Sequence, residues 1–309
     1  MDRAVLEQVR IIVAHENCAD GTASAILLHD ALPHCEVVFA DYGHEGDRLP
    51  AREGMLFCDF SPPPERVEEF VAANSIVLDH HRSARDVVER FGARGIYADE
   101  VKDPGVSGAV LAFREVWLPL RGDSPERAFA ESFATAAGAR DTWQTASPAW
   151  KAGCVQQSVL STFGQPYWLT IPLSTLATEW STRYVPIGEQ VTSRKRARLL
   201  DTIRQSYPFT TKRGLRVLAM NSLGSASDAA EEAHDVDVVV AFDIVLDEGQ
   251  MLMRMSLRSH TGFDCAAFAS ALGGGGHTRA SGCAIRVAAN DPHPFRLLER
   301  LFADAAAPR

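Results

Sequence analysis

Three ionisable residues, Asp79, His80 and His81, follow directly after the apolar run SIVL. Such a run is typical of a buried strand in a parallel sheet, and ligands of open α/β sheets bind beyond the carboxyl ends of the strands. Further polar residues follow apolar runs in the same way: His15, Asn17, Asp20 and Asp59. A solvated turn explains any one of these residues, so it is their shared placement that indicates a site.

The residue types indicate a metal centre. Carboxylates and imidazoles that are brought together repel one another and lose solvation, and bound divalent cations compensate for both. Oxygen-rich sites with a minority of imidazole suit Mn²⁺ or Mg²⁺. Two such ions about 3.5 to 4 Å apart can clamp a phosphate, activate a water molecule and stabilise the leaving oxygen. The chemistry indicated is hydrolysis of a phosphate ester or anhydride.

The elements that must position these residues form an α/β pattern. Four apolar runs, at 9–15, 35–43, 54–60 and 74–81, each contain or end in His or Asp near their carboxyl end. Stretches with helical spacing separate them, which predicts a doubly wound, mainly parallel sheet with all strand ends at one edge. Residues 125–200 are predicted to be mostly helical, and Ser107 is predicted to cap a helix.

A second, smaller α/β domain is predicted after a polar, basic helix. We expect a catalytic domain over 1–187, a linker helix over 188–213, a substrate-binding domain over 214–309 and a cleft between the two domains. The second domain contains the run GGGGHTR. Glycines let the backbone approach an anion closely, and basic side chains add donors, so the run predicts phosphate binding. The expected substrate-binding residues are Arg258, Ser259, Gly274, Gly275, Gly276, His277 and Arg279.

Composition narrows the possible partners. The 309 residues carry a formal net charge of −9, which disfavours tracking a long phosphate backbone, so we expect no long duplex nucleic acid as partner. No segment approaches the ~18 to 20 apolar residues of a membrane span, and no signal peptide is expected at the N-terminus. The 6 cysteines show no CxxC spacing. We therefore expect a cytoplasmic protein, monomeric or homodimeric, without membrane association.

The motifs together resemble those of the DHH phosphoesterase superfamily, and the resemblance spans almost the full chain. The chain resembles oligoribonuclease-like and bisphosphonucleotide phosphatase-like members, and the first-motif variant H-x-D-C-x-D-G of the oligonucleotide-hydrolase-like members is matched by His15, Cys18, Asp20 and Gly21. Asp59 matches the second motif, VLDHH the third, and the Asp141 of ARDTW the fourth. The second domain resembles the DHH-associated domain, with SLRS and GGGGHTRASG.

The resemblance implies two Mn²⁺ ions per chain, with Mg²⁺ as the alternative. One ion would be held by His15, Asn17 and Asp59. The implied ligands of the other ion are Asp20, Asp59, His80 and Asp141, so that Asp59 bridges the pair. Asp79 would orient an imidazole, and His81 would face the substrate phosphate as a hydrogen-bond donor or proton source.

One position departs from the family pattern. Where the family has an aspartate, this chain has Asn17, whose amide oxygen coordinates a hard cation without contributing charge. The leading hypothesis is a Mn²⁺-dependent phosphoesterase for small phosphorylated nucleotides: short oligoribonucleotides, bisphosphonucleosides or cyclic dinucleotides. Two alternatives remain open, a pyrophosphatase or exopolyphosphatase and a catalytically silent nucleotide-binding module.

Overall fold

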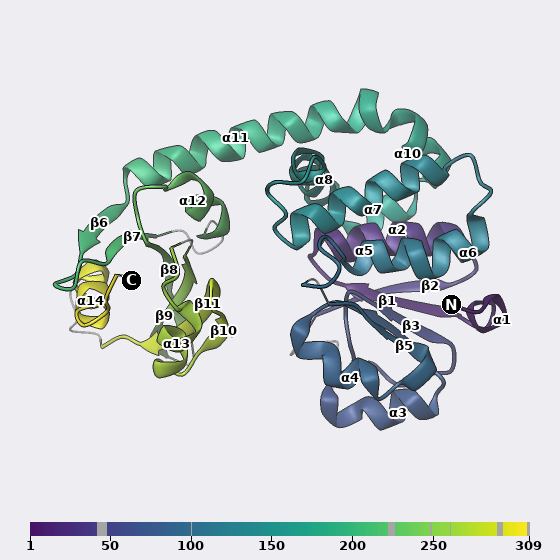
Figure 1. The fold of residues 1–309 in the computed structure, drawn as a ribbon, viewed down its shortest axis with the longest axis horizontal. Coiled ribbons are helices and arrows are strands. Elements are labelled where there is room, and N and C mark those ends of the chain that lie inside the picture. The colour runs from purple at the N-terminus through teal and green to yellow at the C-terminus, as the bar shows by residue number, and fades with distance from the viewer. Residues whose placement is uncertain are drawn as a thin grey trace. The chain divides into compact units, whose positions relative to one another are not determined.

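The computed structural model describes residues 1–41, 48–99, 101–221, 226–247, 249–259, 261–288 and 293–307, without the side chain of His277. The chain forms two compact units, Met1–Thr192 and Ser193–Arg309. Helix α11 (Val185–Arg204) contains the boundary between them, and Figure 1 shows it as the long helix at the top.

The first unit is built on a five-stranded parallel sheet, as predicted. Its strands are β1 (Ile11–His15), β2 (Glu36–Ala40), β3 (Met55–Cys58), β4 (Ile76–Asp79) and β5 (Gly95–Tyr97), in the order β2-β1-β3-β4-β5. The first four occupy the predicted runs. The three-residue β5 is too short to give a hydrophobic pattern and was not predicted.

Helices cover both faces of this sheet (Figure 1). On one side lie α2 (Ala19–Ala31), α5 (Gly108–Leu111), α7 (Arg127–Asp141) and α8 (Trp150–Phe163), and on the other α3 (Val67–Ala72) and α4 (Arg85–Glu89). Within β3, Leu56 packs into the core beneath the first group and Phe57 into the core beneath the second. Because both faces are buried, the strands have continuous apolar sequences instead of alternating ones.

The remaining elements of the first unit are short. They comprise α1 (Arg3–Leu6), η2 (Pro64–Arg66), η3 (Arg82–Ala84), η4 (Gly92–Arg94), α6 (Leu118–Arg121), α9 (Gln165–Leu169) and α10 (Leu173–Glu179). Two segments, η5 (Ala112–Trp117) and η6 (Trp180–Tyr184), are π-helical. The structure confirms the mostly helical region predicted between 125 and 200.

The second unit is built on a six-stranded mixed sheet in the order β10-β11-β9-β8-β7-β6. The strands are β6 (Tyr207–Thr210), β7 (Arg216–Met220), β8 (Val238–Asp247), β9 (Gln250–Arg258), β10 (Gly275–His277) and β11 (Ala280–Arg286). Three helices accompany them: α12 (Ala226–Glu232), α13 (Cys265–Ala271) and α14 (Pro294–Leu301). The predicted helix over 188–213 is α11, which ends at Arg204; β6 follows and pairs with β7.

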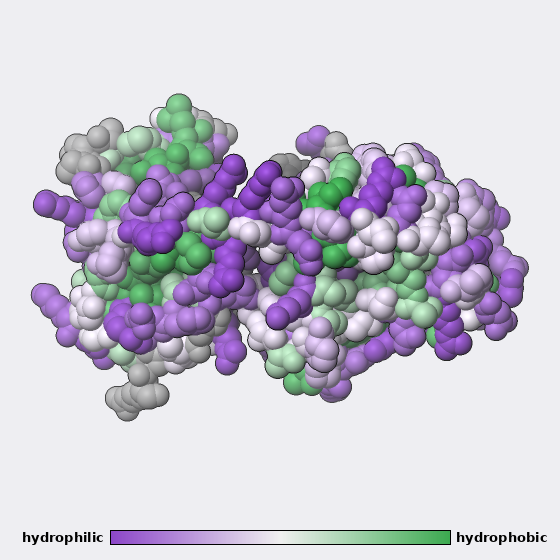
Figure 2. Space-filling model, turned by 90° about the horizontal axis from the view of Figure 1, so that it is seen from above, coloured by the Kyte–Doolittle hydropathy of each residue, from purple (hydrophilic) through white to green (hydrophobic). Residues whose placement is uncertain are grey.

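Polar side chains are widespread on the face of the molecule seen in Figure 2. Figure 2 shows hydrophilic side chains over much of the face in view, with apolar groups in scattered patches. Among the described residues, none of the helices combines the length and the apolar character needed to cross a bilayer.

Candidate metal centre

The site begins where the strand order reverses. β1 has β2 on one side and β3 on the other, and Ala14 of β1 pairs with Cys58 of β3. Site residues stand at the carboxyl ends of both strands: His15 is the last residue of β1, and Asp59 comes directly after β3. Carboxyl ends of strands at such a switch point form the ligand-binding crevice of open α/β sheets.

The first group of ligand atoms is formed by His15, Asp59 and His81, and these atoms lie within 4.8 Å of one another. His15 Nδ1 is 3.6 Å from Asp59 Oδ2, and His81 Nδ1 is 3.9 Å from Asp59 Oδ1. Asp59 adopts a left-handed backbone conformation with φ of 59°. Such strained conformations are concentrated at functional sites.

The second group is formed by Asp20, His80 and Asp141, also with ligand atoms within 4.8 Å. His80 Nε2 lies 3.3 Å from Asp141 Oδ2 and 3.2 Å from Asp59 Oδ1. Asp59 Oδ2 therefore faces His15 of the first group, whereas Oδ1 faces His80 of the second group and, at the longer distance of 3.9 Å, His81 of the first. This is the arrangement expected of a carboxylate that bridges two cations.

Asp59 provides a test of whether a cation fits. Its carboxylate is 1% exposed, and among the described residues its Oδ2 has no hydrogen-bond partner. Burial alone would raise the pKa of Asp59, but interactions with His15, His80 and His81 outweigh it and lower this pKa. A buried, ionised oxygen without a donor is costly, and a divalent cation compensates for that cost. The residues present fit a metal centre.

The close packing of charged groups also shifts the pKa values of Asp20 and His80. Burial and the neighbouring carboxylates of Asp59 and Asp141 raise the pKa of Asp20. Burial lowers the pKa of His80, but its hydrogen bond to Asp59 and the charge of Asp141 raise it to about 10. A raised imidazole pKa favours a proton beside the carboxylates, and a bound divalent cation would take over this charge compensation.

Asp79 belongs to neither group and holds an imidazole instead. Its carboxylate is fully buried and accepts hydrogen bonds from Ser61 Oγ at 2.5 Å, His81 N at 2.9 Å and His81 Nδ1 at 2.8 Å. Although burial lowers the pKa of His81, the bond to Asp79 raises it to about 9. Asp79 thus fixes the ring orientation of His81 and leaves Nε2 as its other polar atom.

Residues at the start of α5 hold the Asp20 carboxylate and lie close to Asp59. Ser107 Oγ donates to Asp20 Oδ1 at 2.6 Å, and Ala109 N donates to both Asp20 oxygens at 3.2 Å. Ser107 also accepts from Val110 N, as predicted for a helix cap. A Cβ atom added to Gly108 would lie 2.3 Å from Asp59 Cβ, so only glycine permits this approach.

The backbone N–H of Asn17 is bonded to a residue outside both ligand groups. Asn17 is exposed with φ of 53°, and its N–H donates to Gln165 Oε1 at 3.1 Å. Gln165 Nε2 in turn donates to His15 O at 2.9 Å. A carboxylate that sequence reasoning missed, Asp41, lies with Oδ1 3.4 Å from His15 Nε2. The available signal was its position directly after the apolar run EVVFA.

The substrate-binding residues predicted in the second unit are placed as follows. Arg258 is half-buried and donates from Nε to Ser227 Oγ at 2.9 Å, and burial lowers the pKa of its guanidinium. Ser259 is 3% exposed, and its hydroxyl donates to Asp237 O at 2.8 Å, which is a structural bond. Arg279 is exposed. The side chain of His277 lies outside the described part of the chain.

The glycine run forms a strand edge. Gly275 and Gly276 belong to β10, which pairs with β11, whereas Gly274 precedes it. Gly276 has φ of +135°, and a Cβ there would lie 2.7 Å from Ala280 O, so the close strand approach itself requires glycine. A Cβ at Gly275 would meet nothing within 4 Å, and this residue is exposed.

Searches against family models and curated proteins found no match to this sequence. Solved structures do match. The DHH domain of a member of the s1p family of ribosomal proteins is 15% identical, with a TM-score of 0.62 over 99% of this chain and 89% of that one. The chain has the DHH fold.

Two further structures share the DHH fold. The pGpG-specific phosphodiesterase PggH from Vibrio cholerae is 14% identical, with a TM-score of 0.56 over 96% of this chain and 100% of that one. RecJ from Thermus thermophilus, solved in complex with Mn²⁺, is 18% identical, with a TM-score of 0.53 over 91% of this chain and 51% of that one.

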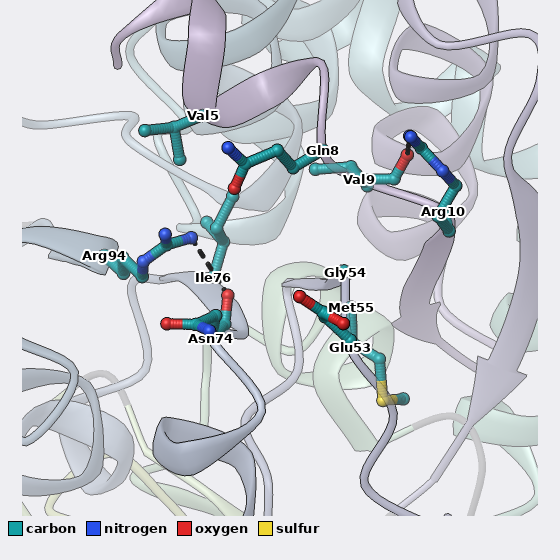
Figure 3. A pocket seen from close by; sticks show the side chains of 10 residues that line it. All are labelled: Val5, Gln8, Val9, Arg10, Glu53, Gly54, Met55, Asn74, Ile76 and Arg94. Carbon is teal, nitrogen blue, oxygen red and sulfur yellow. Dashed lines mark hydrogen bonds between the residues drawn. The ribbon is translucent and has the colours of Figure 1, made fainter.

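Two cavities of this DHH fold are not lined by any of the metal-centre groups. One of about 300 Å³ lies at the amino ends of the strands, where Gly54 precedes β3 and Ile76 begins β4. Figure 3 shows Arg94 in this cavity, donating to Asn74 O at 3.0 Å. The other, of about 460 Å³, lies between α7 and the residues around Gly105. Neither contains a residue of the two ligand groups.

Proposed function

We propose that the chain is a metal-dependent phosphoester hydrolase that acts on small phosphorylated nucleotides with two Mn²⁺ ions. The observation that carries this proposal is the place of Asp59. Its buried carboxylate lies between the two groups of potential ligands, with Oδ2 facing His15 and Oδ1 facing His80, and Oδ2 lacks a hydrogen-bond partner among the described residues. The DHH fold shared with a phosphodiesterase and with a Mn²⁺-bound protein supports the same conclusion.

Each group would hold one ion. His15, Asp59 and Asn17 would bind the first, and His81 lies beside them. The proposed ligands of the second ion are Asp20, Asp59, His80 and Asp141. Bound divalent ions supply a water activated for attack and neutralise charge on the phosphate. Ser107 and Ala109 hold the Asp20 carboxylate in place through hydrogen bonds.

His81 would act on the substrate directly. Asp79 accepts a hydrogen bond from Nδ1 of His81, which would leave Nε2 to donate to a phosphate oxygen or to protonate the leaving oxygen. The side chain of His81 is 35% exposed, whereas that of Asp59 is 1% exposed, so His81 is the more accessible to a ligand. We therefore assign His81 to the substrate and Asp79 to its orientation.

The second unit would bind anionic groups. Arg258 and Arg279 offer guanidinium donors, and the backbone of Gly275 and Gly276 and the side chain of His277 would add N–H groups. The N–H of Gly274 already donates to Ala269 O at 2.8 Å, so Gly274 would contribute close backbone approach and not a donor. Ser259 already donates to a backbone carbonyl, so its contribution is to fix the end of β9.

Small nucleotides are the favoured substrates. The net charge of −9 opposes binding of long polyanions, whereas a few local cations suffice for a short one. PggH, whose fold this chain shares over its full length, is a phosphodiesterase specific for pGpG. A 5′-phosphorylated dinucleotide is accordingly the first substrate to test.

The test is product release by the purified chain in excess Mn²⁺. A 5′-phosphorylated dinucleotide, 3′,5′-bisphosphoadenosine, cyclic di-AMP and pyrophosphate are compared side by side, each with and without chelator. Turnover of a nucleotide that is lost on chelation supports the proposal. Turnover of pyrophosphate alone contradicts it and favours a pyrophosphatase.

Asn17 gives a second candidate, a catalytically silent nucleotide-binding module. Its side chain is neutral and exposed, so the first ion has fewer charged ligands than the second. Calorimetric titration with Mn²⁺ separates the two functions. Fewer than two ions bound per chain, together with no turnover at saturating metal, would favour the silent module.

A further inference from the structure

Two tryptophans and an arginine lie beside Asp141 along the chain. Trp143 and Trp150 stand near the two ends of the loop between α7 and α8, with ring centroids 5.4 Å apart and planes at 67°. The guanidinium carbon of Arg140 lies 4.8 Å from the Trp143 centroid and 5.0 Å from the Trp150 centroid. All three side chains are half-buried and keep part of their surface in solvent. We call these three residues the tryptophan cluster.

The backbone of Trp143 is unusual for so large a residue. It has φ of 57°, in the left-handed region that favours glycine. Gln144 N donates to Ala139 O at 2.8 Å, which is the bond that closes a helix end around a left-handed residue. Glycine or asparagine is common at that position, and a bulky side chain there is strained. Backbone outliers of this kind are found where the side chain has a use.

The tryptophan cluster is close to the proposed phosphate position. Trp143 Cα lies two trans peptide units beyond Asp141 Cα, hence at most about 7.6 Å away. Asp141 Oδ2 is itself 3.3 Å from His80 Nε2 in the second ligand group. The backbone of Trp143 is therefore within the reach of a single nucleotide whose phosphate lies at this group.

We propose that the tryptophan cluster is a base-stacking subsite, in which the nucleobase of a substrate lies on Trp143 while its phosphate lies at the metal centre. The inference rests on the proposed function and deepens it, because it names a nucleobase as a recognised group. Every base has a π face that stacks on an aromatic ring, and the Arg140 charge attracts both the ring system and a phosphate. Purines, with the larger face, bind better than pyrimidines.

The experiment measures equilibrium binding of GMP and of ribose 5-phosphate in excess Mn²⁺ by calorimetry. These probes share the sugar and phosphate and differ only in the base. Trp143→Gly suits the backbone, so it should fold, and we expect it to weaken GMP binding about 10-fold while ribose 5-phosphate binding is kept. Trp143→Phe retains a ring and should retain most of the GMP affinity.

Trp180→Phe is the matched control. Trp180 packs against Phe133 and Trp168, away from the tryptophan cluster, and its replacement should leave the ratio of the two affinities unchanged. Thermal unfolding of each variant checks that it is as fully folded as the wild-type chain at the temperature of the binding measurement. A purely structural role of Trp143 would lower the unfolding temperature of Trp143→Gly without changing that ratio.

Two results would overturn the subsite: a wild-type chain that binds GMP no better than ribose 5-phosphate, or a Trp143→Gly variant that keeps the wild-type ratio. Failure of the proposed function is a different result. A wild-type chain that prefers GMP through Trp143 but hydrolyses none of the four substrates refutes catalysis and leaves the subsite in place.

Discussion

His80 Nε2 lies 3.2 Å from Oδ1 of Asp59, which precedes it by 21 residues. The pair joins the ends of two neighbouring strands, since Asp59 follows β3 and His80 follows β4. Through this contact the second ligand group is connected to the carboxylate of the first. The metal centre is therefore one unit in which changing Asp59 affects both groups.

Asp59→Asn should remove turnover and leave the fold intact. Asparagine tolerates the left-handed backbone of this position, with φ of 59°, so the change removes charge with little added strain. We expect Mn²⁺ affinity and kcat to fall at least about 100-fold, measured by calorimetry and by the substrate assay. A variant with wild-type activity would refute the bridging role.

Asp79→Asn should impair catalysis more than metal binding. The change removes the negative charge and one acceptor oxygen of the group that orients His81, so kcat should fall by about 10-fold to 100-fold. Ser61→Ala is the matched control, because it deletes the other side-chain donor to Asp79 and leaves His81 held. Equal losses in the two variants would show that general disruption, not His81 orientation, is responsible.

Asp41→Asn should weaken binding of the first ion. His15 presents Nδ1 towards Asp59 and Nε2 towards Asp41, which is the carboxylate–histidine arrangement that supports a metal ligand. We expect Mn²⁺ affinity to fall about 10-fold to 100-fold by calorimetric titration. Glu36→Gln, at the opposite end of the same strand, removes the same charge and should leave the affinity unaltered.

Gly108→Ala should destabilise the first unit. The new Cβ would lie 2.3 Å from Asp59 Cβ and 2.8 Å from Asp20 Oδ2, so backbone or ligands must move. Overpacking of this kind costs about 1 to 3 kcal/mol in the free energy of unfolding, to be measured by denaturant titration. At Gly275 an added Cβ meets nothing within 4 Å, and Gly275→Ala should change this free energy little.

Asp237→Asn should destabilise the second unit in a pH-dependent manner. Hydrogen bonds from Arg216 lower the pKa of Asp237 in the folded state. The ionised carboxylate therefore contributes stability at pH values above the ordinary carboxylate pKa, and this contribution is lost as pH falls through the lowered one.

At pH 7 we expect a loss of about 1 kcal/mol, since Arg216 is half-exposed and water screens the pair. Thermal unfolding at pH 7 and at about pH 3 measures the difference, which should shrink in acid. The more exposed pair of Asp243 and Arg254 provides the control, and Asp243→Asn should have a smaller effect. A larger loss in acid would contradict the assignment.

Much of the first sheet could be predicted from local sequence. Strands buried on both faces, such as β3 and β4, consist of continuous apolar residues, and the runs MLFC and IVL show this pattern. β5 and β6 could not be predicted, because both strands are short and their residues are partly or mostly exposed. Their conformation is decided by hydrogen bonds to neighbouring strands. The role of Gly108 could not be predicted either, because its close contact with Asp59 joins two distant segments and leaves no periodic pattern in the sequence.

The sequence by itself determined the first four strands of the first sheet, the kind of residue at their carboxyl ends and hence the ligand types of the candidate site. Only the tertiary structure decided which of those residues meet. Placing β1 between β2 and β3 brings His15 between Asp41 and Asp59 and groups His81 with them. Strand order depends on long-range pairing and on helices packed across both faces, and no local pattern encodes such contacts.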